Sequence, residues 1–352
     1  MVKAVKVKPS VSGSLDYPYA EAPAPAALRE VASGVYWLRM PLPFALEHIN
    51  LWLLADGAGW TIVDCGFGSD ATRELWRRIF AEQLQGRPVT RIVVTHFHPD
   101  HFGLAAWLAE TGRAPVMMTE PEFAAARGWH AARDLHTREA YLELFRKHGL
   151  SVPASDDSGP TRENLFKRGV PALPAQITPL HGATQLEIGG RSWRVLAGYG
   201  HSPEHAALYC EKLGVMIAGD MVLPRISTNV SVTPHEPEAD PLGAFLASVA
   251  RYAECDARTL VLPSHGLPFY GLRERVKSLE RHHAQRLDEL LGACDSARSG
   301  AELMPALFRR ALDAQQTFFA MGETLAHLNY LMGRGELRRN LAADGIYRFA
   351  RA

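Results

Sequence analysis

The sequence predicts an α/β protein that ends in a smaller, mainly helical domain. Short apolar segments rich in Val, Ile and Trp recur between turn residues, a pattern typical of β-strands. Segments with apolar residues at helical spacing lie between them, and this mixture favours an α/β architecture. From about residue 272 the strand pattern gives way to long amphipathic stretches. A chain of 352 residues is long enough for one large domain and a small one.

The composition is that of an ordinary globular protein and argues against several functional classes. The 38 Lys and Arg residues balance the 38 Asp and Glu residues, whereas a protein built mainly to hold nucleic acid or an anionic membrane would show a basic excess. No apolar run approaches the roughly 18 residues of a membrane helix, and the N-terminus lacks the apolar core of a secretory signal. We therefore expect a cytoplasmic protein with no membrane association.

The cysteines support the same location. Cys65, Cys210, Cys255 and Cys294 are scattered and form no C-x-x-C pair, which argues against a zinc ribbon or a redox dithiol. We expect four small, buried, unpaired residues in a reducing compartment.

The first half of the chain supplies an arm, four strands and two helices. Residues 1–30 are rich in Pro and Ala and predict an arm that runs over the surface. Strands are expected at 34–40, 49–56, 60–66 and 90–96, with a hairpin turn at 56–59. Helices are expected at 70–84 and 101–112.

The second half resumes the strands after an interruption. Residues 121–175 are helix-like and then rich in Ser, Pro and Asp, and we expect an insertion beside the sheet edge, where substrate lids often lie. Strands are expected at 184–190, 192–198, 205–211, 214–220 and 258–265. These elements define one large domain at 31–271.

Residues 272–352 predict a separate C-terminal module. They begin with a long amphipathic stretch, and Ser299 and Glu302 fit a capping box at the start of the next helix. A third helical stretch ends in glycines, and Asp344-Gly345 is a hairpin turn signal near the end of the chain. Three helices and a hairpin suggest a winged-helix-like module.

The segment TRIVVTHFHPDHFG contains the strongest chemical signal. It holds His96, His98, Asp100 and His101 where an apolar strand runs into a helix. Imidazole and carboxylate are preferred ligands of zinc and related divalent metals. A chance H-x-H-x-D-H has odds of roughly one in a thousand in a chain of this composition, so the motif indicates a metal site.

Three later residues complete a pattern. His201 in GYGHSPEH, Asp220 in IAGDMV and His265 in VLPSHG each follow an apolar strand. Polar residues at strand ends are usually presented at the rim of the sheet. Since they follow a strong metal motif, we expect them to join it.

The ordered set HFHPDH, GHSPEH, AGD and SHG resembles the metallo-β-lactamase superfamily over roughly residues 30–270. The resemblance implies an αββα sandwich with two metal ions at one rim. It implies that His96, His98 and His201 hold the first ion, that Asp100, His101 and His265 hold the second, and that Asp220 bridges them. Zinc suits these ligands best, and iron and manganese remain open.

Further residues receive roles on weaker grounds. The resemblance implies that Asp64 in TIVDCG hydrogen-bonds to a ligand histidine, and His205 is a candidate for the same outer layer. Tyr199 either donates a hydrogen bond to a developing oxyanion or is a packed aromatic residue. Arg225 either meets an anionic substrate tail or is an ordinary surface arginine. Glu204 stands where the family often has glycine.

The sequence context is most similar to the glyoxalase II-like branch of the superfamily. This similarity implies a binuclear hydrolase in which a metal-bridging hydroxide, oriented by Asp100, attacks a small thioester, ester or lactone. The alternative is a phosphodiesterase or endoribonuclease whose C-terminal module binds RNA. Residues 272–352 hold 13 basic and 10 acidic residues and no interleaved aromatic run, so we favour a small-molecule substrate. The module could also cover the site or form a homodimer interface.

Overall fold

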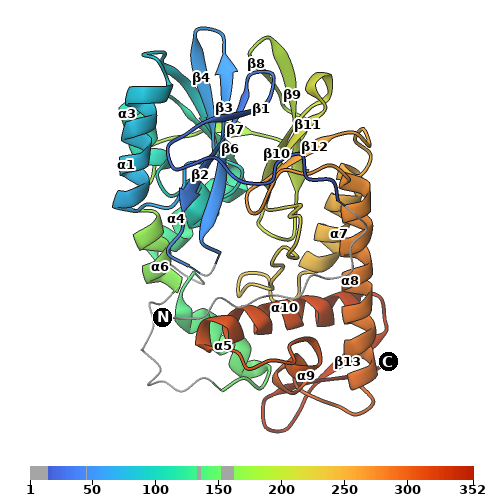
Figure 1. The fold of residues 1–352 in the computed structure, drawn as a ribbon. Helices are drawn as coiled ribbons and strands as arrows, with labels where there is room; N and C mark the ends of the chain where they lie inside the picture. Colours follow the sequence, from blue (N-terminus) through green and yellow to red (C-terminus); the bar gives the residue numbers. More distant parts are fainter. Residues whose placement is uncertain (1–14, 45, 133–135, 152–161) are drawn as a thin grey trace.

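Two β-sheets lie face to face at the centre of the protein, with helices on both outer sides (Figure 1). The computed structural model describes residues 15–44, 46–132, 136–151 and 162–352. This is the expected αββα sandwich, with an additional helical region at the C-terminal end.

In the described part of the chain, the first sheet has seven strands and the second has five. The first contains, in spatial order, β1 (Arg29–Ala32), β2 (Val35–Pro41), β3 (His48–Asp56), β4 (Gly59–Val63), β5 (Val89–Val93), β6 (Val116–Thr119) and β7 (Thr178–Leu180). The second contains β12 (Leu260–Pro263), β11 (Val215–Gly219), β10 (His205–Cys210), β9 (Arg191–Gly198) and β8 (Gln185–Ile188).

The helices cover the two outer faces and form the C-terminal region. Those that follow the first sheet are α1 (Asp70–Arg78), α2 (Pro99–Phe102), α3 (Ala105–Gly112), α4 (Glu120–Ala131), α5 (Arg138–Lys147) and α6 (Arg162–Gly169). Then come α7 (Pro241–Tyr252), α8 (Leu272–Ala293), α9 (Gly300–Leu307) and α10 (Ala314–Gly333). Single turns, η1 (Ile79–Gln83) and η2 (Glu211–Leu213), follow α1 and β10, and β13 (Leu337–Leu341) pairs with β14 (Tyr347–Arg351).

Apolar side chains from both sheets fill the space between them. Trp37 and Trp52 of the first sheet and Trp193 of the second are no more than 1% exposed and belong to one cluster. Every residue of β10 and of β11 is buried, because both strands are covered on both faces. The sandwich thus fixes the strand ends on which the polar motifs lie.

The predicted strands are confirmed within a few residues, and the helices differ more. The helix expected at 70–84 ends at Arg78 and continues as the π-helical turn η1. The helix expected at 101–112 is two short helices, α2 and α3, separated by Gly103 and Leu104. The sequence interpretation missed β1, β6, β7, α6 and α7. All four cysteines are unpaired and buried, as expected.

The expected N-terminal arm lies partly outside the described residues, which begin at residue 15. From there the chain runs over the sandwich, and Asp16 pairs with Tyr270 through the backbone. The arm ends earlier than expected, because β1 already begins at Arg29.

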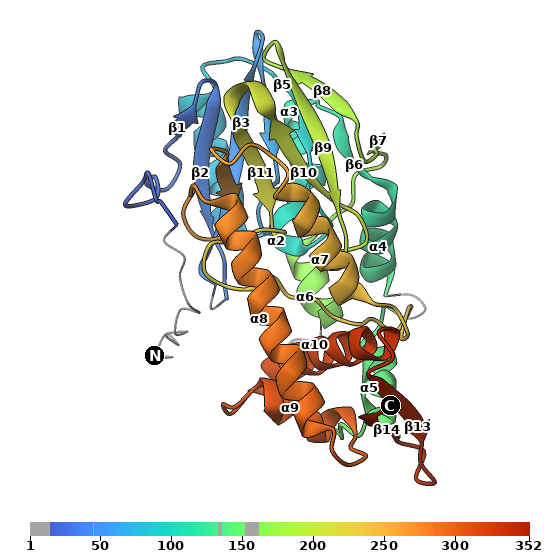
Figure 2. The ribbon, with the colours of Figure 1, turned by 90° about the vertical axis from the view of Figure 1, so that its right-hand side faces the viewer.

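The C-terminal region contains three helices and a hairpin below the sandwich (Figure 2). The Ser299–Glu302 capping box at the start of α9 is confirmed, as is the hairpin through Asp344-Gly345. Its winged-helix-like character stays a prediction. The long helix α8 connects it to the sandwich, and its residues Val276 and Leu279 are no more than 2% exposed and belong to the same core cluster as the outer helices.

Helix α5 of the insertion packs on the C-terminal region. The Phe145 ring lies 4.9 Å from that of Phe318 on α10, and the His148 ring stacks on Phe349 of β14. This part of the insertion therefore joins the two regions and is not a free lid at a sheet edge. Met321 and Leu325 on α10 are buried inside the chain.

We predict that a chain truncated after Gly271 will aggregate. Removing α8 and α10 exposes the apolar face of α7, including Leu242 and Phe245, which are fully buried in the complete chain. Size-exclusion chromatography and dye binding, compared with the full chain, measure this. A monodisperse truncated protein with native far-ultraviolet circular dichroism would contradict the prediction.

Candidate metal centre

The polar motifs of the sequence meet at one rim of the sandwich. Residues 96–101 follow β5, His201 follows β9, and Asp220 and His265 follow β11 and β12. β11 and β12 are parallel, so their carboxyl ends point to the same edge. The fold thus brings together seven side chains that are far apart in the sequence, at positions 96, 98, 100, 101, 201, 220 and 265.

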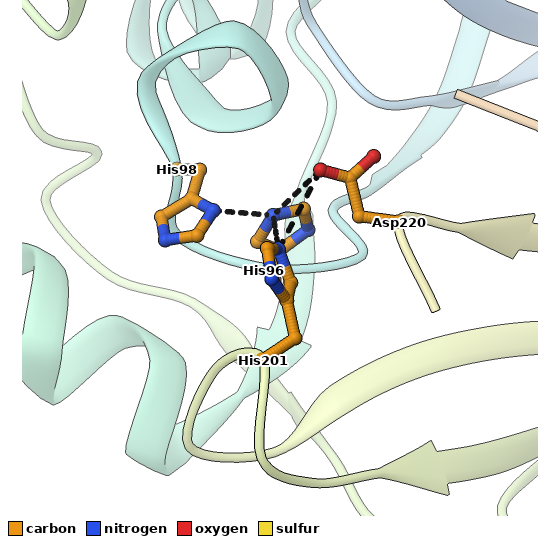
Figure 3. Close-up of side chains that lie close together, drawn as sticks. All are labelled: His96, His98, His201 and Asp220. Atoms are coloured by element: carbon orange, nitrogen blue, oxygen red, sulfur yellow. Dashed lines mark hydrogen bonds and ion pairs between the residues drawn. The ribbon is translucent and has the colours of Figure 1, made fainter. Parts of the chain in front are cut away.

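The first ligand group contains His96, His98, His201 and Asp220 (Figure 3). The Nε2 atom of His96 lies 2.9 Å from Nδ1 of His98 and 3.2 Å from Nε2 of His201. Oδ2 of Asp220 lies 3.5 Å from Nε2 of His201 and 4.0 Å from that of His96. Three imidazole nitrogens and one carboxylate oxygen therefore face a common point, as a divalent metal requires.

The second ligand group contains Asp100, His101 and His265. Nε2 of His265 lies 3.4 Å from Oδ2 of Asp100, and Nε2 of His101 lies 3.8 Å from the same oxygen. Oδ1 of Asp220 lies 3.5 Å from Nε2 of His101 and 3.4 Å from Nε2 of His265. Asp220 thus points one oxygen at each group.

The chemistry of these atoms fits metal ions. Nε2 of His101 and Oδ1 of Asp220 are buried and have no hydrogen-bond partner among the described residues. A buried polar atom without a partner is costly, and a bound cation satisfies both a lone pair of imidazole and a carboxylate oxygen. The residues are therefore positioned to bind metal ions.

Hydrogen bonds on the far side of three imidazoles fix which nitrogen faces the centre. Nδ1 of His201 donates to the carbonyl of Asn229 at 2.8 Å, and Nδ1 of His265 donates to the carbonyl of His48 at 2.8 Å. Nδ1 of His101 donates to Oδ2 of Asp64 at 2.7 Å. In each case Nδ1 carries a proton, so Nε2 is the nitrogen that faces the centre and is placed to bind a metal ion.

Asp64 has the place that the resemblance implied. It is 1% exposed, has a positive φ of 63°, and follows β4 directly. Besides His101, it accepts hydrogen bonds from the backbone N–H and the hydroxyl of Thr95. A non-glycine residue in this conformation is strained, and these hydrogen bonds hold it there.

Charges within the centre shift the pKa values of its members. Burial opposes ionisation of Asp220, but His265, His101 and His201 outweigh it and hold the pKa of Asp220 well below its usual range. Burial alone would lower the pKa of His265, but Asp220 and Asp100 raise it to about 10. Burial and the neighbouring imidazoles lower the pKa of His96 and of His98. An ion bound to the centre would displace the proton of His265.

The remaining predicted residues lie at different distances from the centre. The His205 ring is buried, with its centroid 5.1 Å from that of His96, and it hydrogen-bonds to none of the ligands. Tyr199 is 37% exposed, and its hydroxyl donates to Glu204 at 3.4 Å. Arg225 is exposed and lies over the Tyr17 ring. The roles proposed for these three residues stay predictions.

Glu122 is an important residue that the sequence interpretation missed. It lies in the first turn of α4 and is fully buried. Its Oε1 accepts from the Ser202 hydroxyl at 2.6 Å and the Glu204 N–H at 2.7 Å, and its Oε2 accepts from the Phe97 N–H at 3.0 Å. One carboxylate thus joins the loop of His96 and His98 to the loop of His201. An acidic residue beside Pro121 at a helix start is too common to have indicated this role.

We predict that Glu122→Gln will destabilise the protein. The substitution places an amide NH₂ against an N–H or O–H donor, and a buried donor without an acceptor costs about 1–3 kcal/mol. Urea unfolding of the metal-free protein measures the change in the free energy of unfolding. Glu120→Gln, an exposed position in the same helical turn, is the matched control. Equal stability of the two variants would show that Glu122 does not hold the two loops together.

Comparisons with known proteins agree with this geometry. Residues 45–265 match the metallo-beta-lactamase superfamily, and residues 287–352 match the C-terminal domain of metallo-beta-lactamase-like proteins. The crystal structure of a beta-lactamase domain protein from Burkholderia ambifaria is 50% identical, covers 96% of this chain and 98% of that one, and superposes with a TM-score of 0.89.

Curated proteins are similar at lower identity. A probable metallo-hydrolase of Bacillus subtilis, YqjP, is 26% identical over 88% of this chain and 96% of its own length. An atrochrysone carboxyl ACP thioesterase of Pseudocercospora fijiensis is 23% identical over 87% of this chain and 73% of its own length. The family match covers most of the chain, includes every residue of both ligand groups, and coincides with the αββα fold. The protein therefore belongs to the metallo-β-lactamase superfamily and has the C-terminal domain found in metallo-β-lactamase-like proteins.

Proposed function

We propose that the protein is a binuclear metal-dependent hydrolase that acts on a small thioester, ester or lactone. The observation that carries the proposal is the position of Asp220, whose two oxygens face two separate groups of ligands. A carboxylate in this position suits two ions rather than one. We assign His96, His98 and His201 to the first ion, Asp100, His101 and His265 to the second, and Asp220 to both.

Two ions held there would supply an activated water molecule and Lewis-acid stabilisation of developing negative charge. Residues of the chain would orient the water molecule and the ligand imidazoles. Oδ2 of Asp100 faces the centre and lies 3.4 Å from Nε2 of His265. This oxygen can accept a hydrogen bond from a water molecule and so orient it. Asp64 keeps the proton of His101 on Nδ1, which holds the imidazole in its ligand form.

The ligand chemistry favours zinc, because mixed imidazole and carboxylate donors suit this metal. Iron and manganese accept the same donors, so metal analysis decides among them. We also propose a cytoplasmic location, which the four unpaired, buried cysteines support.

The substrate class rests on two further observations. The fungal relative named as a thioesterase matches along most of this chain, although at only 23% identity. The C-terminal region has only a small basic excess, and several of its arginines are paired with acidic residues, including Arg309 with Glu289 and Arg348 with Asp344. Paired arginines offer little to a phosphate backbone. These observations support a small-molecule acyl substrate and a glyoxalase II-like reaction.

We predict that the metal-loaded protein will hydrolyse a thioester or lactone. The test is a panel of a glutathione thioester, an acyl-homoserine lactone, an aryl ester, a phosphodiester and a short RNA. Asp100→Ala is expected to lower kcat at least about 100-fold, because it removes a ligand and the group that orients water. Asp295→Ala is the matched control, because the Asp295 side chain is 79% exposed and forms an ion pair with Arg351 in the C-terminal region. Cleavage of RNA or the phosphodiester alone would replace the acyl-substrate proposal with the nuclease alternative.

We predict that the protein binds two ions and that their removal lowers its stability. An ion present at 1,000 times its Kd stabilises the folded state by about 4 kcal/mol, and a chelator removes that contribution. Elemental analysis measures the stoichiometry, and thermal unfolding with and without chelator measures the change in Tm. Asp220→Asn should bind less metal than the unsubstituted protein. A stoichiometry of one ion would contradict the binuclear assignment.

A further inference from the structure

The segment at 221–240, which connects Asp220 to helix α7, supports a ligand of the proposed metal centre. It begins directly after Asp220, and the hydroxyl of Thr228 donates back to the Asp220 carbonyl. The carbonyl of Asn229 accepts the hydrogen bond from Nδ1 of His201 at 2.8 Å. The position of this segment therefore decides which way the His201 imidazole points.

The C-terminal region holds the beginning of this segment through Arg275 on α8. The Arg275 side chain is buried, and its Nε donates to the carbonyl of Leu223 at 2.6 Å. Its Nη2 donates to the carbonyl of Ile226 at 2.7 Å. A buried guanidinium that binds two backbone carbonyls fixes the path of the chain between them.

Helix α10 packs directly against the middle of the segment. The N–H of Val232 donates to the carbonyl of Gly322 at 3.2 Å. A Cβ atom added at Gly322 would lie 2.9 Å from both Cβ and Oγ of Ser231, so only glycine allows the helix and the segment to lie this close. The Ser231 hydroxyl in turn donates to Oδ1 of Asn229 at 2.9 Å. Helix α10 therefore contacts Ser231 and Val232, and Asn229, whose carbonyl orients His201, lies only two residues before Ser231.

Helix α10 also holds the end of the segment. The side-chain amide of Asn329 donates to the carbonyl of Pro237 at 2.9 Å and to that of Ala239 at 2.8 Å. Asn329 is 5% exposed, so these hydrogen bonds are largely shielded from water. The segment is therefore fixed at its beginning, middle and end by residues beyond position 271.

We propose that the C-terminal region supports metal binding at the centre. It fixes the 221–240 segment in the position in which the carbonyl of Asn229 orients His201. Gly322, Asn329 and Arg275 are positioning residues that act through this segment. The inference rests on the proposed function, since it assumes that His201 binds an ion. It gives the C-terminal region a role at the centre that needs neither RNA nor a second subunit.

The experiment measures Zn²⁺ binding to full-length variants by competition with a chromophoric chelator. Gly322→Ala should weaken binding of one ion by about 10- to 100-fold, the usual effect of disturbing a residue that orients a metal ligand. The second ion should bind as before, because Asp100, His101 and His265 are oriented by other elements. Gly333→Ala, at an exposed position of the same helix where an added Cβ meets nothing within 4 Å, is the matched control and should bind both ions normally.

A compensating variant separates positioning from general loss of stability. The double substitution Gly322→Ala/Ser231→Gly removes the two Ser231 atoms that the new methyl group meets, but it also removes the hydrogen bond from Ser231 to Asn229. It should therefore bind the weakened ion more tightly than Gly322→Ala alone, without restoring the full affinity. Unfolding of the metal-free variants is measured alongside. If Gly322→Ala alone does not fold, Asn329→Leu, which removes two hydrogen bonds to the segment, should give the same selective loss of one ion.

Three outcomes would overturn the inference. Equal affinities for both ions in Gly322→Ala and Gly333→Ala would show that the helix does not act on His201. Equal weakening of both ions, together with a lower Tm of the metal-free protein, would show a general effect on stability. An unsubstituted protein that binds no metal would overturn the proposed function as well, whereas the first two results leave that function standing.

Discussion

The carboxylate of Asp220 lies between two groups of imidazoles, and the rest of the centre is arranged around that contact. Its two oxygens face His201 on one side and His101 and His265 on the other, at 3.4–3.5 Å. So many polar groups at one largely buried rim lose much of their hydration, and bound cations and outer hydrogen bonds offset that cost. The structure supplies the outer hydrogen bonds itself, and the geometry leaves the inner positions to metal ions.

Those outer hydrogen bonds come from different layers of the protein. In the first sheet, Asp64 accepts a hydrogen bond from His101, and the carbonyl of His48 accepts one from His265. The insertion provides Glu122, whose buried carboxylate connects two ligand loops. The segment before α7 provides the carbonyl of Asn229 to His201. The centre therefore depends on the sandwich, the insertion and, through the segment, the C-terminal region.

The proposed role of the C-terminal region agrees with its close packing against the sandwich and the 221–240 segment. α8 belongs to the same core cluster as the outer helices of the sandwich, and α10 contacts the segment at a glycine where no larger residue fits. The aromatic contact between Phe145 and Phe318 adds a second connection through the insertion. No helix in the described part of the chain is long and apolar enough to cross a membrane.

The sequence by itself determined most of the strands, the candidate ligand residues and the family resemblance, because each depends on local pattern. The H-x-H-x-D-H motif and the polar residues after apolar strands required no tertiary information, nor did the capping box at Ser299. The tertiary structure decided what depends on distant contacts. It split the helix predicted at 101–112, placed α5 against α10, buried Glu122 between two loops, and directed Tyr199 toward Glu204. These features follow from which surfaces meet when the two sheets and the C-terminal region pack, and no spacing along the chain encodes that.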